Sequence, residues 1–187
     1  SSGRAVPQEA DPRRGIPRAR NAALEKCRSL GADWIAFTDD DCWASPRWLA
    51  SLLDAAQRHR ADVVYGRREF LFPTPLPFWG VHAEGEVLPH AATHNVLLPG
   101  RLVRGDAGIR FDERLAHGED TDFFHRAARR GARIVYSAEP LVLEVVSPDR
   151  ATFHYQTRRA YYYAASRSYF HRRYKGAHRA AARLAAR

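Results

Sequence analysis

Cysteine is scarce in this sequence, with only Cys27 and Cys42 among 187 residues. The two thiols match no zinc-binding spacing, and so few cysteines favour a reducing compartment over a disulfide-stabilised secreted domain. There is no apolar run of about eighteen residues, which excludes a membrane-spanning helix. A signal-peptide pattern and a glycine-rich phosphate-binding loop are also missing. We therefore expect a cytoplasmic protein, either free or peripheral on the cytoplasmic face of a membrane.

Acidic side chains are missing from residues 151–187, although this segment contains nine lysines and arginines. All 21 Asp and Glu residues therefore lie in residues 1–150, where they match the 21 other basic residues in number. The formal net charge of +9 belongs to the C-terminal segment alone. Its partners can be considered separately from the function of the neutral body.

The chain divides into three parts by composition. Its length and its hydrophobic content of 45% suffice for one domain with a buried core. Residues 1–14 are polar and contain two prolines, which predicts a disordered leader. Residues 15–150 form the expected α/β domain, and residues 151–187 form a basic, aromatic helical tail.

Hydrophobic periodicity predicts helices over residues 15–31 and 46–60 and strands over residues 34–37 and 62–66. The inner face of the second helix is predicted to carry Leu49, Leu52, Leu53 and Ala56. A strand, an acidic turn, a helix and another strand in this order predict a mostly parallel sheet with right-handed crossovers, flanked by helices.

Residues 70–99 are rich in proline and aromatic side chains. Such a segment is either a functional loop or poorly ordered. His82, His90 and His94 lie within it and form no recognisable ligand set, so we expect surface or loop histidines.

Three consecutive aspartates, Asp39, Asp40 and Asp41, follow the first predicted strand. Carboxylates packed this closely repel one another unless a cation lies among them. Mg²⁺ or Mn²⁺ suits such oxygen ligands, with substrate phosphate oxygens completing the site. The alternative is an acidic turn that caps the next helix. However, Ser45 followed by Pro46 already provides an N-cap for that helix.

A second acidic motif, Glu119, Asp120 and Asp122, begins a further predicted helix. These carboxylates can be purely structural, because they complement the helix dipole. Beside a metal-bound diphosphate, a carboxylate fixed at a helix start could also act as a general base. Arg20 lies in the first turn of the 15–31 helix, where the dipole disfavours a cation. Exposure to solvent and contact with an anionic or polar ligand are equally open for its side chain.

Several blocks of the sequence, taken in their order and spacing, resemble a family 2 glycosyltransferase. The blocks are residues 15–21, 34–48, 93–96, 111–131 and 133–136. That family has the GT-A fold, a single α/β domain that binds a nucleotide-diphosphosugar. The family's opening strand, helix and strand, which hold the nucleotide base, have no counterpart before Gly15. The resemblance therefore implies an N-terminally truncated GT-A-like domain, whose exposed strand edge would favour a homo-oligomer.

The resemblance also implies roles for individual residues. Asp39 and Asp41 would be the metal-binding pair, with Asp41 the more direct ligand of Mg²⁺ or Mn²⁺. Asp120 would be the catalytic base that deprotonates the acceptor hydroxyl, and Glu119 would help to position the acceptor. The donor, a nucleotide-diphosphosugar such as a UDP-sugar, would be bound by Arg20, Asn21, Asp39, Asp40 and Asn95. The implied reaction is an inverting, in-line displacement at C1 of the sugar.

Two other functions are compatible with the residues. A non-catalytic module could keep the fold and bind through its basic tail. A metal-dependent phosphate-transfer enzyme could use the aspartates, although it would need a phosphate loop. For residues 151–187, docking onto the body, contact with an anionic membrane surface and nucleic-acid binding are all open, the last being the least favoured. A membrane position would suit a transferase acting on a glycan or lipid-linked acceptor.

Overall fold

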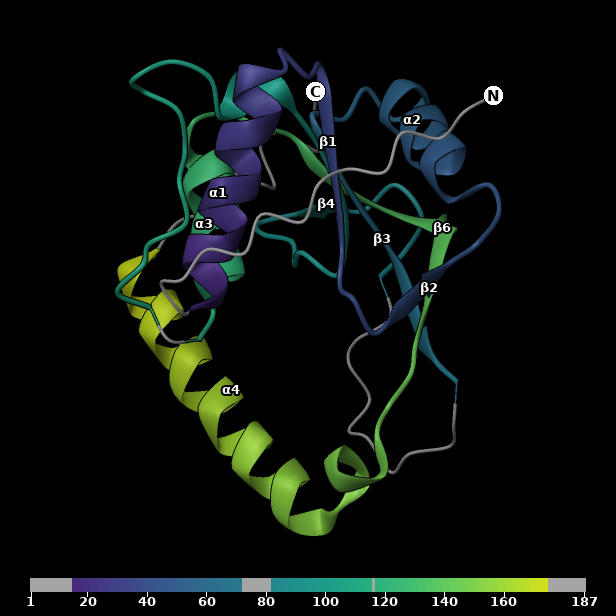
Figure 1. Ribbon diagram of the computed structural model, residues 1–187, viewed down its shortest axis with the longest axis vertical. Helices are drawn as coiled ribbons and strands as arrows, with labels where there is room; N and C mark the ends of the chain where they lie inside the picture. The colour runs from purple at the N-terminus through teal and green to yellow at the C-terminus, as the bar shows by residue number, and fades with distance from the viewer. Residues whose placement is uncertain (1–14, 72–81, 116, 175–187) are drawn as a thin grey trace.

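A computed structural model describes residues 15–71, 82–115 and 117–174 (Figure 1). The predicted leader, the middle of the proline-rich segment and the end of the tail lie outside these ranges. The described elements, in chain order, are α1 (Ile16–Ser29), β1 (Trp34–Thr38), β2 (Cys42–Ala44), α2 (Trp48–Arg58), β3 (Val63–Phe70), β4 (Val87–Leu88), β5 (Asn95–Pro99), the 3₁₀ helix η1 (Gly100–Leu102), α3 (Glu119–Arg129), β6 (Ile134–Glu144), the 3₁₀ helix η2 (Pro148–Ala151) and α4 (Phe153–Arg173).

The strands form one mixed sheet in the order β1-β5-β3-β6-β2, with β4 also paired to β6. Among the described pairings only β3 with β6 is parallel, so the prediction of a mostly parallel sheet is wrong. The crossover through α2 does leave β1 and β3 pointing the same way. However, β5 inserts between them and runs antiparallel to both.

Strand β5 was missed because its sequence lacks the usual alternation of polar and apolar residues. All five of its residues are buried, which is typical of a central strand covered on both faces. It also follows a proline-rich stretch that predicts a loop. Because this stretch was expected to be a loop, the predicted sheet omitted β5 and its antiparallel pairings with β1 and β3.

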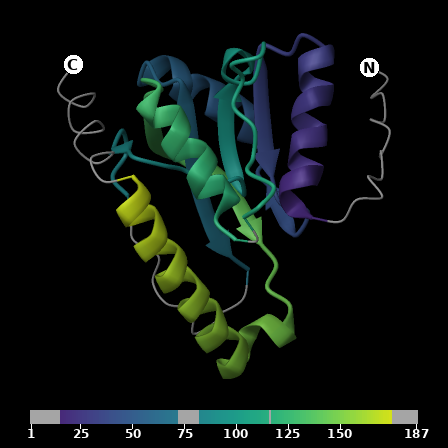
Figure 2. The same cartoon turned by 90° about the vertical axis from the view of Figure 1, so that its left-hand side faces the viewer.

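Helices α1 and α3 cover one face of the sheet and α2 covers the other (Figures 1 and 2). Because successive strand residues point to opposite faces, each central strand feeds two cores. The larger core contains Leu24 of α1, Phe123, Phe124 and Ala127 of α3, and the strand residues Val63, Val96, Leu98 and Ile134. The smaller core contains Leu52, Ala55 and Ala56 of α2 with Val64, Leu97 and Val135.

The region after the aspartates differs from its prediction in two respects. Residues Cys42–Ala44 form β2, so the acidic turn joins two strands rather than a strand and a helix. Helix α2 begins at Trp48, with Arg47 at its N-cap position, and the Ser45 side chain does not cap it. Instead the Ser45 carbonyl accepts a hydrogen bond from the Trp48 amide at 2.9 Å. Leu49, predicted to face inward, has 50% of its surface exposed.

Helix α4 leaves η2, rises past the lower part of the sheet and reaches α3 with its last turn (Figure 2). There Phe170 and Tyr174 are buried and pack with Leu115. Docking onto the body, one of the three states open for the tail, therefore applies to this end of α4. No helix in the described part of the chain is both long enough and apolar enough to cross a membrane.

Candidate active site

The aspartate turn lies between the end of β1 and the start of β2, where it is held by backbone hydrogen bonds. The Cys42 amide donates to the Asp39 carbonyl at 3.1 Å, and the Val145 amide donates to the Asp41 carbonyl at 2.9 Å. The side chains of Asp39 and Asp41 are partly buried, whereas Asp40 is exposed. The turn therefore presents two carboxylates in partly buried positions and directs the third to solvent.

Arg20 connects this turn to the second acidic motif. Its Nη2 lies 3.5 Å from Asp39 Oδ1, and its Nη1 forms a hydrogen-bonded ion pair with Glu119 Oε1. Only 17% of the Arg20 side chain is exposed. The unfavourable position in the dipole of α1 is thus offset by two carboxylates from distant parts of the chain. Full exposure to solvent, one of the two options left open for Arg20, is therefore not observed, and its contact with a ligand stays a prediction.

Arg20 joins the aspartate turn to the start of α3, and the region around these contacts is called the acidic junction. Burial and crowding of carboxylates shift the pKa values of side chains in this region. Burial raises the pKa of Asp39, the Arg20 guanidinium opposes that rise, and the Asp41 carboxylate adds to it. Burial also raises the pKa of Glu119, with a further contribution from Asp120, again opposed by Arg20. The pKa of Cys42 is raised to about 12 by burial and by the nearby carboxylates, of which Asp41 contributes most. The junction is therefore a region where negative charge is costly and a cation would be stabilised.

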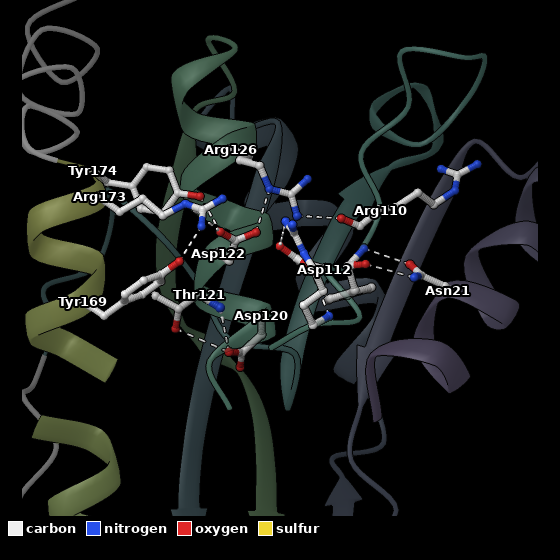
Figure 3. A network of polar contacts seen from close by, with 12 residues as sticks. Asn21, Arg110, Asp112, Asp120, Thr121, Asp122, Arg126, Tyr169, Arg173 and Tyr174 are labelled. Atoms are coloured by element: carbon white, nitrogen blue, oxygen red, sulfur yellow. Dashed lines mark hydrogen bonds and ion pairs between the residues drawn. The ribbon is translucent and has the colours of Figure 1, made fainter. Parts of the chain in front are cut away.

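Asp120 lies at the start of α3, directly after the residues that contact Arg20. Gly118, at the N-cap position, has a left-handed φ of 76°, which turns the chain into the helix. The Asp120 Oδ1 accepts hydrogen bonds from the Thr121 amide at 2.6 Å and the Thr121 hydroxyl at 3.4 Å (Figure 3). Among the described residues no hydrogen bond engages the other oxygen, Oδ2. A carboxylate oriented in this way can accept a proton at Oδ2.

Asn21 and Asn95, both expected at the donor site, form hydrogen bonds within the chain. The Asn21 amide side chain exchanges two hydrogen bonds with the Phe111 backbone, at 2.8 and 3.0 Å, and so fixes the loop before α3 against α1. Asn95 is fully buried within the sheet. Its side chain donates to the Arg67 and Pro140 carbonyls and accepts from Trp48 Nε1 at 2.8 Å. In the sheet, Asn95 is the partner of Thr38, the residue before Asp39.

His94 lies in the turn before β5, as predicted for a loop histidine, but it is not a surface residue, because only 6% of it is exposed. Its Nε2 lies 3.1 Å from the Tyr65 hydroxyl. Burial, together with the positive charges of Arg68, Arg159 and Arg20, holds the pKa of His94 well below its usual value. His82 is half-buried and His90 is exposed.

Arg150 contacts the aspartate turn, although no role was predicted for it. Its Nη1 donates to Asp41 Oδ2 at 2.7 Å, bringing the segment after β6 to the aspartate turn. Nearby, the buried Glu144 pairs with Arg68 Nη1 at 2.7 Å. Spacing alone could not reveal these contacts, because they depend on β2 pairing with the end of β6. The one available signal was the presence of Glu144 and Arg150 just after the last apolar strand.

Asp39 and Asp41 can be tested as ligands of a divalent metal. In the described part of the chain, no three His, Cys, Asp or Glu side chains are grouped to hold such an ion. However, Mg²⁺ needs only one or two protein carboxylates when substrate phosphates and water complete its coordination. The mutual effect of Asp39 and Asp41, which raises the Asp39 pKa, would be relieved by a cation between them. The pair therefore fits a metal that arrives with a diphosphate.

A comparison with protein families and curated proteins identifies relatives. The model of a family described as "Glycosyl transferase family 2" matches residues 10–174. The succinoglycan biosynthesis protein ExoM of Rhizobium meliloti (strain 1021) is 35% identical over 169 residues, which cover 80% of this chain and 51% of ExoM. The chain therefore spans about half the length of this curated relative.

Solved structures of TarS from S. aureus share the fold at low sequence identity. One TarS structure has a TM-score of 0.55 and 22% identity, covering 72% of this chain and 25% of TarS. A structure of TarS residues 1–349 in complex with UDP-GlcNAc has a TM-score of 0.52 and 20% identity, covering 71% of this chain and 39% of that one. A further structure of the same fragment contains UDP and has a TM-score of 0.51. At this level of identity the likeness concerns the fold alone.

Proposed function

This chain belongs to glycosyl transferase family 2, and on that premise we propose that it moves a sugar from a nucleotide-diphosphosugar to an acceptor hydroxyl with inversion at the sugar C1. A UDP-sugar is the proposed donor, because TarS, which shares the fold, has been crystallised with UDP and with UDP-GlcNAc. The proposed acceptor is a hydroxyl of a glycan or of a lipid-linked sugar.

The observation that carries the proposal is the double contact of Arg20. Asp39 and Glu119 lie 80 positions apart in the sequence, yet both carboxylates contact the same guanidinium. Asp120, the proposed base, directly follows Glu119. This contact supports the proposal that the metal ligands and the base act at one site, as a transfer between a bound donor and a bound acceptor requires.

In the proposed reaction, Asp120 accepts the proton of the acceptor hydroxyl through Oδ2. The acceptor oxygen then forms its bond to C1 of the sugar as the bond from C1 to the diphosphate oxygen breaks. The nucleoside diphosphate leaves with the electron pair of that bond. The hydrogen bonds from Thr121 hold Asp120 Oδ1 and so orient the carboxylate.

Asp39 and Asp41 would hold Mg²⁺ or Mn²⁺, which when bound supplies charge neutralisation for the leaving diphosphate. Arg150 contributes a further positive charge at the same place, because its guanidinium already lies against Asp41. Glu119 forms an ion pair with Arg20 and directly precedes Asp120. It is the proposed contact for an acceptor hydroxyl. Because Arg20 contacts both Asp39 and Glu119, it would hold the proposed metal ligands beside the proposed base.

The experiment that tests the shared junction compares Arg20→Gln with Arg18→Gln. Arg18 lies on the same helix, has 42% of its side chain exposed and pairs with Glu113 instead. Loss of hydrogen bonds to charged groups costs about 1.5–3 kcal/mol, so we expect Arg20→Gln to lower kcat/KM roughly 10- to 100-fold, with little effect of Arg18→Gln. Equal effects of the two substitutions would contradict a joining role for Arg20.

Metal dependence is tested by calorimetric titration of UDP and GDP with and without Mn²⁺. We expect Mn²⁺-dependent binding of UDP that is lost in Asp41→Ala and kept in Asp54→Ala, which changes an exposed aspartate of α2. Absence of nucleotide binding by the folded wild type would contradict the proposed activity. That result would favour a non-catalytic module with the same fold.

A further inference from the structure

Helix α4 carries exposed aromatic side chains beside exposed arginines. Phe153 is 87% exposed and Tyr161 is 72% exposed, while Tyr162 and Tyr169 are 40% and 39% exposed. Arg158 and Arg172 are exposed on the same helix. The helix sequence contains no Asp or Glu. Apolar rings and cations are therefore presented to solvent without a neighbouring acidic residue on the helix.

Arg158, Tyr161 and Arg172 lie on the side of α4 that faces away from α3. Phe170 and Tyr174 form the docked side, and at 100° per residue these three residues fall on the opposite half of the helix, with Phe153 and Tyr162 at its flanks. A shallow hollow of about 350 Å³ lies on this outward face, lined by His154, Thr157, Arg158, Tyr161 and Tyr162. The Arg158 guanidinium lies over the Tyr162 ring, 5.7 Å from its centroid. The outward face of α4 thus combines ring surface with fixed positive charge.

We propose that the outward face of α4 binds an anionic lipid surface. Aromatic rings are stable at the level of the headgroups, and arginines beside them attract lipid phosphates. Charge complementarity supports this partner, because the excess of positive charge in the chain lies in residues 151–187 while the rest is neutral. Nucleic acid is a less suitable partner, since the cations and rings lie on one side of a single helix rather than along a basic groove.

The position of this face relative to the active site gives the contact a function. The Tyr162 ring packs on the His117 ring, with centroids 5.0 Å apart. His117 is followed by Gly118 and the acidic residues that begin α3. A lipid contact at α4 is therefore connected through Tyr162 to the turn that carries Asp120. This part of the inference rests on the proposed function and implies an acceptor presented from the lipid surface.

The test is co-sedimentation of the full chain with vesicles of phosphatidylcholine alone or with 30% phosphatidylglycerol, at several salt concentrations. We expect binding that requires the anionic lipid and weakens with salt. Each arginine near an anionic surface contributes about fivefold in partitioning, so Arg158→Glu and Arg172→Glu should each weaken binding at least about fivefold. Phe153→Ser and Tyr161→Ser should weaken it independently of salt.

Matched controls are Arg47→Glu and Leu30→Ser. Arg47 has 78% of its side chain exposed before α2, and Leu30 is 71% exposed after α1, both away from α4. These two variants should bind vesicles like the wild type. UDP binding by each α4 variant, measured separately, reports whether the donor site and the fold are intact, so failure of the lipid contact and failure of the proposed function give different results.

Three outcomes would overturn the inference. The first is vesicle binding that does not depend on phosphatidylglycerol or is unchanged in Arg158→Glu. The second is tighter binding of a single-stranded oligonucleotide than of vesicles through the same arginines, which would assign the face to nucleic acid. The third is concentration-dependent self-association that is lost in Tyr161→Ser without vesicle binding, which would assign it to a second copy of the chain.

Discussion

Individual side chains at this site are defined by partners that are distant in the sequence. Arg20 is stabilised by carboxylates from two separate segments, and Asp41 is paired with Arg150, which is 109 positions away. Such contacts place opposing charges where burial alone would make each ionised group costly. The result is a polar junction with partly buried carboxylates. Burial has the corresponding effect on a base at His94, because it lowers the pKa of that side chain.

His94 gives a prediction for the dependence of stability on pH. Its pKa in the folded chain is lowered by burial and by nearby cations, whereas an unfolded histidine titrates near 6.5. Below about pH 6.5 the unfolded chain therefore binds a proton that the folded chain does not, and the free energy of unfolding falls as the pH is lowered, by up to about 1.4 kcal/mol per pH unit.

The measurement is urea unfolding at pH 7.5 and 5.5 for the wild type, His94→Gln and His154→Gln. Substitution of His94 should reduce the loss of stability on acidification, whereas substitution of the exposed His154 should leave it unchanged. Comparison of variants removes the effect of Asp39 and Glu119, whose raised pKa values act in the opposite direction. An identical pH dependence in all three proteins would show that His94 is not the group responsible.

The sequence was informative for charged residues and less so for amides. The family resemblance, rather than charge alone, predicted that Asp39, Asp41 and Asp120 lie at one site, and the residues by themselves left the position of the Arg20 side chain open. The role of Asn95 at the donor site stays a prediction, because an amide serves equally well at a ligand site and inside a sheet. Its burial follows from the close approach of β3, where a Cβ on Gly66 would lie 2.3 Å from the Asn95 amide nitrogen.

At the scale of elements, the last turn of α4 contacts the first turn of α3. Asp122 is fully buried and binds Arg126 Nε at 2.7 Å, while the Tyr174 hydroxyl donates to its other oxygen (Figure 3). Phe170 lies over Gly118, where a Cβ would approach its ring to 2.5 Å. The tail helix is thus attached to the turn that carries Glu119 and Asp120.

This attachment predicts the effect of Tyr174→Phe. Removal of the hydroxyl leaves Asp122 Oδ1 with only the ion pair to Arg173 Nε at 3.7 Å, and the lost hydrogen bond costs about 1–3 kcal/mol and loosens the end of α4. We expect faster hydrogen exchange of the backbone amides in the last two turns of α4 and a lower kcat. Tyr161→Phe, which changes an exposed tyrosine of the same helix, is the matched control. Unchanged exchange in Tyr174→Phe would mean that the apolar contact of Phe170 suffices to hold the helix.

Elements with clear periodicity were predictable, and those defined by tertiary contacts were not. The ends of α1 and the existence of α2 follow from spacing and from Gly31, which adopts a left-handed φ of 65° after α1. Strand β2 has only three residues and exists because it pairs with β6 at Glu144, Leu143 and Val142. No local pattern in Cys42–Ala44 could indicate that pairing, so the turn was expected to lead directly into a helix.

At the scale of the whole molecule, donor binding should be coupled to stability. A ligand that binds only the folded chain adds about 2.7 kcal/mol at one hundred times its Kd, which for a chain of this size corresponds to a rise in Tm of roughly 5–11 °C. We expect such a rise with UDP and Mn²⁺ together, and its loss on addition of EDTA. A similar rise with UDP and EDTA would indicate binding without a metal. The proposed roles of Asp39 and Asp41 as ligands would then be incorrect.

The order of the strands also has a consequence in time. Strand β6 pairs with β2, β3 and β4, and it follows all of them in the chain. Cys42 meets Glu144, so about 100 residues must be synthesised after the aspartate turn before its second strand has a partner. At the usual rate of about 5–20 residues per second, that interval is roughly 5–20 s on the ribosome. During it the nascent chain carries an acidic turn without the strand that completes it, and pairings of such long range fold slowly even afterwards. The proposed donor site is therefore among the last parts of the described domain to form.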